Sequence, residues 1–247
     1  MKLKIGVRGS KLALAYANRV CNELACDTEI IPIKTQGDLN PDVPIYEMGG
    51  KGVFCNTIET ALLNDEIDVA VHSLKDMPGE EHPDLVISAM LKRNSPHDVL
   101  IGKVNYGFTI GTSSPRREAQ LKELYNNIGV KIKPIRGNID TRLEKLDNGD
   151  YDAIILAEAG LQALGIDREY SRLPIVPAVG QGIIALQTRK TDIETKKIVS
   201  KANHDLTYRQ AKLERALLKG IGGDCHTKVA AYATGDNPIK LEAVYYD

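Results

Sequence analysis

The stretch from Asp68 to Pro78 combines an apolar run with a cluster of reactive side chains. Its sequence, DVAVHSLKDMP, indicates a strand that stops abruptly and then presents Ser73, Lys75 and Asp76. In open α/β sheets, ligands bind beyond the carboxyl ends of the strands, where side chains leave the sheet and face a loop. Asp76 is therefore the first candidate for a catalytic acid or base. The alternative is that Asp76 only caps a turn before Pro78, as aspartate often does.

Positive side chains stand beside the expected starts of four helices. Helix N-termini bind anions because their first amides are unpaired and the helix dipole is positive there. Arginine suits bidentate capture of carboxylates, and four such places are too many for one small anion, so the pattern predicts a ligand with several carboxylates along its length. For each arginine alone, the alternative is an ion pair with a surface acid. The four segments are Arg8-Gly9-Ser10, Gly49-Gly50-Lys51-Gly52, Thr112-Ser113-Ser114 with Arg116-Arg117, and Arg136-Gly137-Asn138.

Cys225 differs from the other three cysteines because it follows a glycine-rich turn, GIGGD, rather than lying on an apolar helix face. A sulfur in such a turn is accessible, and it can act as a nucleophile or as an attachment point. The neighbouring Asp224 disfavours the thiolate, so an ordinary free thiol stays an open alternative. His72 and His226 lack the spacing of metal ligands, and we interpret both as hydrogen-bonding residues; no metal site is predicted.

The composition excludes several classes of protein. The chain has 247 residues, of which 43% are hydrophobic and 26% charged, as is typical of a folded globular protein. A formal net charge of -1, no Trp and only two Phe argue against a nucleic-acid-binding protein. No secretory signal or membrane-length apolar run is present, and the four cysteines have neither zinc-finger spacing nor disulfide density. We therefore expect a reduced, cytoplasmic protein.

The hydrophobic periodicity predicts alternating strands and helices. We expect polar crossings between domains at about 92–98 and 174–182. Two strands alone do not easily form a domain, so the last two must pack on the helix before them or on a neighbour. Strands are predicted at about 2–7, 29–34, 85–91, 108–111, 131–135, 152–157, 183–187, 229–233 and 239–245, besides the run after Asp68, and helices at about 12–24, 56–64, from 115 onward, 139–146, 194–202 and 206–218.

Seven segments, in order along almost the whole chain, resemble motifs of the porphobilinogen deaminases, also called hydroxymethylbilane synthases. The run from Val71 to Pro78 is specific to that family. The resemblance implies an α/β fold of three domains, the first two like type II periplasmic binding proteins with a cleft between them and the third a small α+β domain. We expect domain 1 at 1–94 and 183–203, domain 2 at 95–182, and domain 3, with the cysteine loop, at 204–247. The segments are 8–13, 49–54, 68–78, 111–117, 136–143, 151–161 and 177–182.

The resemblance also implies a function. The expected enzyme is a transferase of tetrapyrrole (porphyrin and haem) biosynthesis that condenses four porphobilinogen units head to tail, releases ammonia and frees linear hydroxymethylbilane. It implies a dipyrromethane cofactor on a thioether at Cys225, catalysis by Asp76, and a monomer without nucleic-acid or membrane partners. The residues that match positions holding the acetate and propionate groups are Arg8, Ser10, Lys51, Ser73, Lys75, Thr112, Ser113, Ser114, Arg116, Arg117, Arg136 and Arg142.

Three features depart from the family pattern. Ala163 stands where many relatives have an arginine, Tyr16 replaces a glutamine, and the chain ends at Asp247, so we expect a shortened third domain. The main rival hypothesis is a two-lobed solute-binding or effector-sensing module that binds a multi-carboxylate ligand without chemistry. Such a module does not need Asp76 and Cys225 together.

Overall fold

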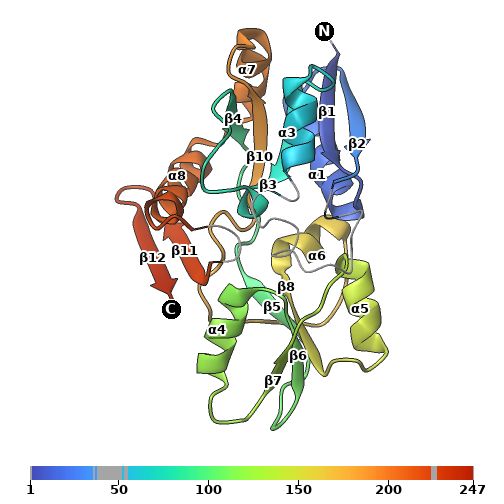
Figure 1. Ribbon diagram of the computed structural model, residues 1–247, viewed down its shortest axis with the longest axis vertical. Helices are drawn as coiled ribbons and strands as arrows, with labels where there is room; N and C mark the ends of the chain where they lie inside the picture. The colour runs from blue at the N-terminus through green and yellow to red at the C-terminus, as the bar shows by residue number, and fades with distance from the viewer. Residues whose placement is uncertain (1, 36, 38–51, 53–54, 224–226, 247) are drawn as a thin grey trace.

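The computed structural model describes residues 2–35, 37, 52, 55–223 and 227–246. Within these residues the strands form two five-stranded sheets and one two-stranded sheet. Figure 1 shows the two larger sheets one above the other, with helix α8 and strands β11 and β12 at one side.

The first sheet has the strand order β2-β1-β3-β10-β4. Strands β2, β1 and β3 are parallel, and β10 runs antiparallel between β3 and β4. Helix α1 (Lys11–Leu24) packs the apolar residues of one of its faces into one core cluster, whereas α3 (Asn56–Leu63) packs into another. The strands are β1 (Leu3–Arg8), β2 (Thr28–Ile33), β3 (Val69–Ser73), β4 (Leu85–Met90) and β10 (Ile184–Arg189).

The second sheet repeats this pattern, with the order β7-β6-β8-β5-β9 and β5 as the antiparallel strand beside β8. Helix α4 (Pro115–Leu124) contributes Leu121 to one core cluster, and α5 (Ile139–Asp147) and α6 (Glu158–Leu164) contribute to the other. Helices that cover both faces of mainly parallel sheets confirm the predicted α/β fold class. The strands are β5 (Asp98–Gly102), β6 (Thr109–Gly111), β7 (Lys131–Lys133), β8 (Ala153–Ala157) and β9 (Ser171–Arg172).

Two crossings connect the sheets, one before β5 and one before β10. They lie side by side, because the Asn94 amide donates to the Gly182 carbonyl at 2.8 Å. A Cβ atom on Gly182, whose φ is +81°, would lie 2.6 Å from the Ser95 carbonyl oxygen. Only glycine fits this position without a rearrangement, so the close pairing of the crossings depends on it.

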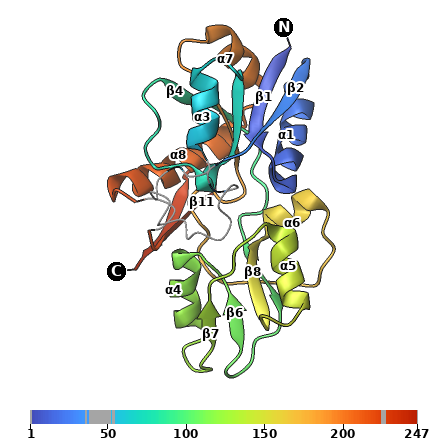
Figure 2. The ribbon, with the colours of Figure 1, turned by 45° about the vertical axis from the view of Figure 1, so that its right-hand side comes forward.

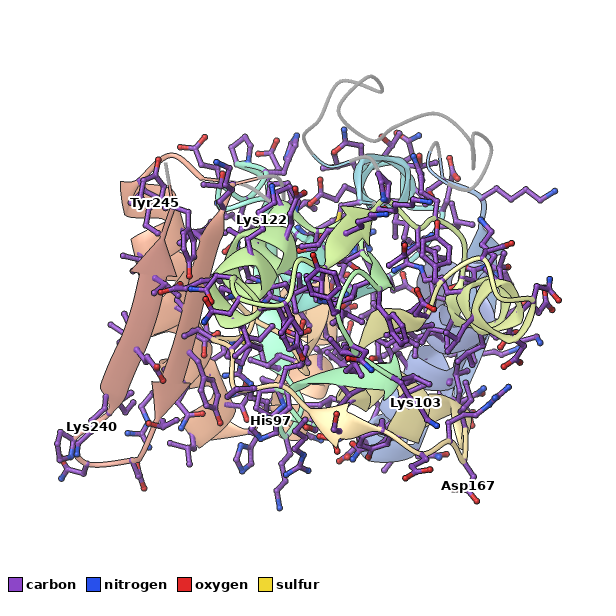
Figure 3. All side chains as sticks on the ribbon, turned by 90° about the horizontal axis from the view of Figure 1, so that it is seen from below. His97, Lys103, Lys122, Asp167, Lys240 and Tyr245 are labelled. Carbon is purple, nitrogen blue, oxygen red and sulfur yellow. The ribbon has the colours of Figure 1, made fainter. Side chains whose placement is uncertain are left out.

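After α7 (Ile193–Val199) and a 3-10 turn η3 (Ser200–Ala202), the chain forms α8 (Asp205–Gly220) and the antiparallel pair β11 (Val229–Thr234) and β12 (Lys240–Tyr245). Leu218 of α8 packs with Val229 and Ala231 of β11, as expected for strands that need a helix to cover them. Figure 2 shows α8 and β11 beside the first sheet, and Figure 3 places Lys240 and Tyr245 at opposite ends of β12.

The structure differs from the prediction in several places. The expected polar crossing at 92–98 ends earlier, because Asp98 is fully buried and begins strand β5. Helix α6 and the two-residue strand β9 were not predicted. The domain boundaries stay a prediction. Within the described part of the chain, no helix has both the length and the apolar character needed to cross a membrane.

Candidate active site

Asp76 lies at the carboxyl end of β3, as the sequence predicted. The strand ends at Ser73, and a 3-10 turn η2 (Leu74–Asp76) follows immediately. Asp76 lines a pocket with Ser73 and with residues from the end of β1 and the start of α1. No described backbone amide donates to its carboxylate, so the geometry does not favour the alternative of a turn cap.

The start of α1 forms the opposite wall of this pocket. Ser10 is the N-cap of α1 and accepts a hydrogen bond from the Ala13 amide at 3.3 Å. Arg8, the last residue of β1, also lines the pocket. The strand β1 and helix α1 therefore bring a cation and a helix N-terminus to the same cavity as Asp76, an arrangement suited to an anionic group.

Tyr16, from the second turn of α1, also lines the pocket and is 8% exposed. Burial, and next the negative charge of Asp76, raise the pKa of Tyr16 to about 12. Tyr16 was noted in the sequence only as a departure from the family pattern. Its place beside Asp76 follows from the pitch of α1, which turns every third or fourth residue to one face.

The charge of Asp76 acts on two cations, Lys75 and Arg142. Burial lowers the pKa of Lys75 to about 8, although the adjacent Asp76 opposes the change. Burial also lowers the pKa of Arg142, on α5, to about 10, and the charges of Arg117 and Arg136 lower it further while Asp76 again opposes. Asp76 follows the first sheet and Arg142 lies on α5 of the second, so the two sheets bring opposite charges near enough to interact.

Arg116 and Arg117 lie in the first turn of α4, but both are paired with a buried internal acid. Arg116 Nη2 lies 2.7 Å from Asp98 Oδ2, and Arg117 Nε and Nη2 lie 2.9 and 2.7 Å from Asp98 Oδ1. Burial by itself would raise the pKa of Asp98, but the two guanidinium groups outweigh this effect and hold it well below its usual range. The sequence analysis considered surface acids as partners and missed Asp98, which directly precedes an apolar run.

The three hydroxyl residues before α4 use their side chains locally. Ser114 is the N-cap of the helix, Thr112 accepts a hydrogen bond from the Ser114 amide at 3.2 Å, and Ser113 donates to the Ile135 carbonyl at 2.8 Å. Arg136 is half-buried at the start of α5, and Arg142 Nε donates to the Gly137 carbonyl at 2.8 Å. Two further predicted site residues, Lys51 and Cys225, lie outside the described residues.

Gln181 connects the turn η2 to this ion cluster. Its Nε2 donates to Asp98 Oδ1 at 3.0 Å and to the Pro96 carbonyl at 2.7 Å, and Lys75 Nζ lies 3.5 Å from its Oε1. Gln181 belongs to the crossing before β10. A polar network thus runs from η2 through the crossing to β5, and this role of Gln181 was not predicted.

His72 also lines the pocket and is a hydrogen-bonding residue, as predicted. Its Nε2 lies 3.1 Å from Gln187 Oε1, and Gln187 Nε2 in turn donates to Glu59 at 2.7 Å. Burial lowers the pKa of His72 to about 4, so the ring is neutral at pH 7. Among the described residues, no three His, Cys, Asp or Glu side chains are grouped as a metal ion would require.

The chain matches a known protein family over most of its length. The family model for "Porphobilinogen deaminase, dipyromethane cofactor binding domain" matches residues 3–197. The chain belongs to the porphobilinogen deaminase family. A "Probable porphobilinogen deaminase" of Archaeoglobus fulgidus is 43% identical over 98% of this chain and 86% of the relative. A "Porphobilinogen deaminase" of Rickettsia prowazekii is 41% identical over 94% of this chain and 82% of the relative.

Solved structures with a similar arrangement include immunogenic lipoprotein A from Vibrio vulnificus, which is 12% identical with a TM-score of 0.49 over 86% of this chain and 99% of that protein. The second substrate-binding domain of Lactococcus lactis GlnP is 13% identical, with a TM-score of 0.45 over 89% of this chain and 90% of that domain.

Membership of the porphobilinogen deaminase family confirms the function expected from the sequence. The chain is a transferase of tetrapyrrole biosynthesis, a hydroxymethylbilane synthase whose small-molecule substrate is porphobilinogen. The expected dipyrromethane cofactor is confirmed as well, because the matched family domain is the one that binds it. The rival hypothesis of a non-catalytic solute-binding module is not favoured.

Proposed function

We propose that Asp76 is the catalytic carboxylate of this hydroxymethylbilane synthase. The observation that carries the proposal is the position of Asp76 just after strand β3, in one pocket with Arg8, Ser10 and Ser73. A carboxylate in this position stabilises positive charge on a pyrrole nitrogen as ammonia leaves the substrate. It also accepts the proton that the attacking ring loses when the new carbon–carbon bond forms.

The described residues fit a ligand with many carboxylates. Burial lowers the pKa of Lys75 and that of Arg142, which supports a role for both in binding negatively charged groups. Acetate and propionate groups would supply the missing negative charge. When bound through the predicted thioether at Cys225, the dipyrromethane cofactor supplies the pyrrole end from which the chain grows. Lys75, Arg142 and Arg136 would hold its carboxylates.

The other predicted binding residues divide into two groups. Arg8, Ser10 and Ser73 lie at the wall of the Asp76 pocket, so we propose that they orient the reacting ring. Thr112, Ser113, Ser114, Arg116 and Arg117 surround the start of α4. We propose that Asp98 fixes the two arginines from behind, so that any remaining donors and the N-terminus of α4 face the acidic groups of the ligand. Lys51 is also proposed to bind an acetate or propionate group of the ligand.

We also propose that the enzyme is a monomer of the cytoplasm without nucleic-acid or membrane partners. The net charge of -1 supports this proposal, as do Cys21 and Cys26, which are half-buried free thiols. The proposed domains are 1–94 with 183–203, 95–182, and 204–247. Light scattering coupled to size exclusion tests the monomer, since a mass well above 27.1 kDa would contradict it.

The catalytic proposal is tested with Asp76→Asn. We expect turnover of porphobilinogen to fall about 10²- to 10⁴-fold, the usual contribution of a positioned acid or base. The circular dichroism spectrum should not change, because the Asp76 side chain makes no hydrogen bond with the described residues. The control is Asp167→Asn on an exposed loop, which should leave turnover unchanged (Figure 3). Normal turnover of Asp76→Asn would refute the assignment.

Intact-mass measurement tests the cofactor assignment separately. Protein made in cells that produce porphobilinogen should carry the mass of a dipyrromethane on Cys225, and Cys225→Ser should carry none. A dipyrromethane adduct on the Cys225→Ser protein would show that the attachment lies elsewhere.

A further inference from the structure

A second cavity, of about 390 Å³, lies away from the Asp76 pocket, between helix α8 and strand β4. Its volume is within the range of small-molecule sites in proteins. Leu85, Ile87 and Met90 of β4 line one side, each at most 4% exposed, and Tyr208 and Ala216 of α8 line the other. Because these β4 residues are almost fully covered, the apolar surface open to a ligand comes from Val86, Tyr208 and Ala216.

The charged residues around this cavity are mostly positive. Lys212, Arg215 and Lys219 come from successive turns of α8, and Lys190 follows β10. Glu81 is the one carboxylate among the lining residues. Lys190 Nζ donates to the Pro83 carbonyl, and Lys212 Nζ lies 5.8 Å from the centre of the Tyr208 ring. Because the cations outnumber the acid, the potential in the cavity favours an anion.

Arg215 is the most buried of these cations, at 7% exposed. Its Nη2 donates to the Pro78 and Gly79 carbonyls at 3.0 and 3.4 Å and lies 3.4 Å from Glu81. Its Nη1 has no hydrogen-bond partner among the described residues. Burial lowers the pKa of this guanidinium, and Glu81 only partly opposes the change. Arg215 therefore lies behind the cavity wall, where its positive charge adds to that of Lys212 and Lys219.

We propose that the cavity between α8 and β4 is a binding site for a small organic anion, a carboxylate carried on an apolar body. The carboxylate faces Lys212 and Lys219, and the apolar body lies against Val86, Tyr208 and Ala216. A free phosphate would use the cations but not the apolar wall, so it binds more weakly. Arg215 also connects the site to Pro78, two residues after the catalytic Asp76.

The test uses 4-phenylbutyrate as the probe and the full-length enzyme, with binding measured by isothermal titration calorimetry. The double variant Lys212→Gln/Lys219→Gln removes two exposed cations without disturbing the core, and we expect its affinity to be about fivefold to tenfold lower. Ala216→Phe, at an exposed position that lines the cavity, should fill it and abolish binding. Inorganic phosphate and 4-phenyl-1-butanol should each bind at least fivefold more weakly than the probe.

Two matched controls locate the binding. Lys201→Gln removes an exposed lysine that does not line the cavity, so it should not change the affinity. Arg142→Gln weakens the cation cluster around Asp76 and should also leave probe binding unchanged, because the proposed site is separate from the active site. The proposal is overturned if the probe does not bind, if the double variant and Ala216→Phe bind it as the wild type does, or if Arg142→Gln abolishes binding.

Discussion

At the scale of one residue, the charge of Lys75 in the candidate active site lowers the stability of the folded protein. It is adjacent to Asp76, yet burial lowers its pKa from 10.5 to about 8. A depressed lysine pKa means that its charge destabilises the folded protein at neutral pH. Between about pH 8 and pH 10.5 the unfolded chain binds more protons than the folded one, so this cost decreases as the pH rises.

We therefore predict that Lys75→Met stabilises the cofactor-free protein at pH 7 while it impairs turnover. The expected gain is on the order of 1 to 3 kcal/mol in the free energy of unfolding, and it should shrink as the pH approaches 10.5. Urea unfolding at pH 7 and at pH 10 measures the gain in the free energy of unfolding at each pH. Lys201→Met, at an exposed site, is the control and should show no such trend. A variant that is less stable than the wild type at pH 7 would contradict the prediction.

The sequence indicated candidate site residues, but it did not indicate the residues that pair with them. Asp76 could be found because a strand-like apolar run ends just before it, and Ser10 because a hydroxyl precedes a helical pattern. Asp98 was missed as the partner of Arg116 and Arg117 because an ion pair between β5 and α4 leaves no periodic signal in the sequence. Gln181 and Tyr16 were also missed as parts of the site, since their positions depend on how the crossings and α1 pack.

At the scale of elements, one carboxylate joins a strand, a helix and a crossing. Asp98 at the start of β5 binds both arginines of α4 and the Gln181 amide from the crossing before β10. Asp98 is fully buried, and the arginines are 4% and 7% exposed. Removal of the shared carboxylate leaves two buried cations without their counterion, which is far more costly than the loss of a surface pair.

Asp98→Asn should therefore lower the free energy of unfolding at pH 7 by about 3 to 5 kcal/mol. The arginines hold the pKa of Asp98 in the folded protein well below the unfolded value of 3.8. The Asp98 carboxylate therefore stabilises the folded protein fully above pH 3.8, and this stabilisation is lost as the pH falls from 3.8 toward the folded-state pKa. The stability gap between wild type and variant should narrow at pH 3, as measured by urea unfolding. Asp167→Asn, at an exposed site, is the control. A decrease of less than about 1 kcal/mol in the free energy of unfolding of Asp98→Asn would show that the ion cluster is not required for stability.

Most elements were predicted from periodicity, but β5, α6 and β9 were not. The polar residues before β5 concealed its start, because Asp98 is a charged residue in a fully buried position. Helix α6 follows β8 directly, with Ala157 as its N-cap and no side-chain cap to mark the boundary. The two-residue β9 is too short to have a pattern of its own.

At the scale of the whole molecule, a buried ion pair fastens α8 to the two crossings. Arg93 Nη1 lies 2.5 Å from Glu214 Oε1, and Arg93 Nε donates to the Gln181 carbonyl at 2.9 Å. Glu214 is fully buried and also accepts from the amides of Gly180 and Ala233. By contrast, the Lys11–Asp140 pair, which joins α1 to α5 at 2.6 Å, is exposed. Spacing in the sequence could not predict these long-range contacts.

We predict that Arg93→Met lowers the free energy of unfolding by about 3 to 5 kcal/mol, because it leaves Glu214 buried without its cation. Lys11→Met removes the exposed pair and should cost less than about 1 kcal/mol. Thermal and urea unfolding of the two variants, side by side, give the comparison. Equal losses would show that burial does not determine the strength of these pairs.

The place of β10 has a consequence for how the chain folds during synthesis. Residues 184–189 form the strand between β3 and β4, whereas every strand of the second sheet lies between residues 98 and 172. During synthesis, the second sheet can therefore form while the first sheet still lacks strand β10. Until then, the apolar edges of β3 and β4 stay open to mispairing and aggregation. A fragment of residues 1–180, released from the ribosome, should resist proteolysis in its second sheet and be cleaved in its first.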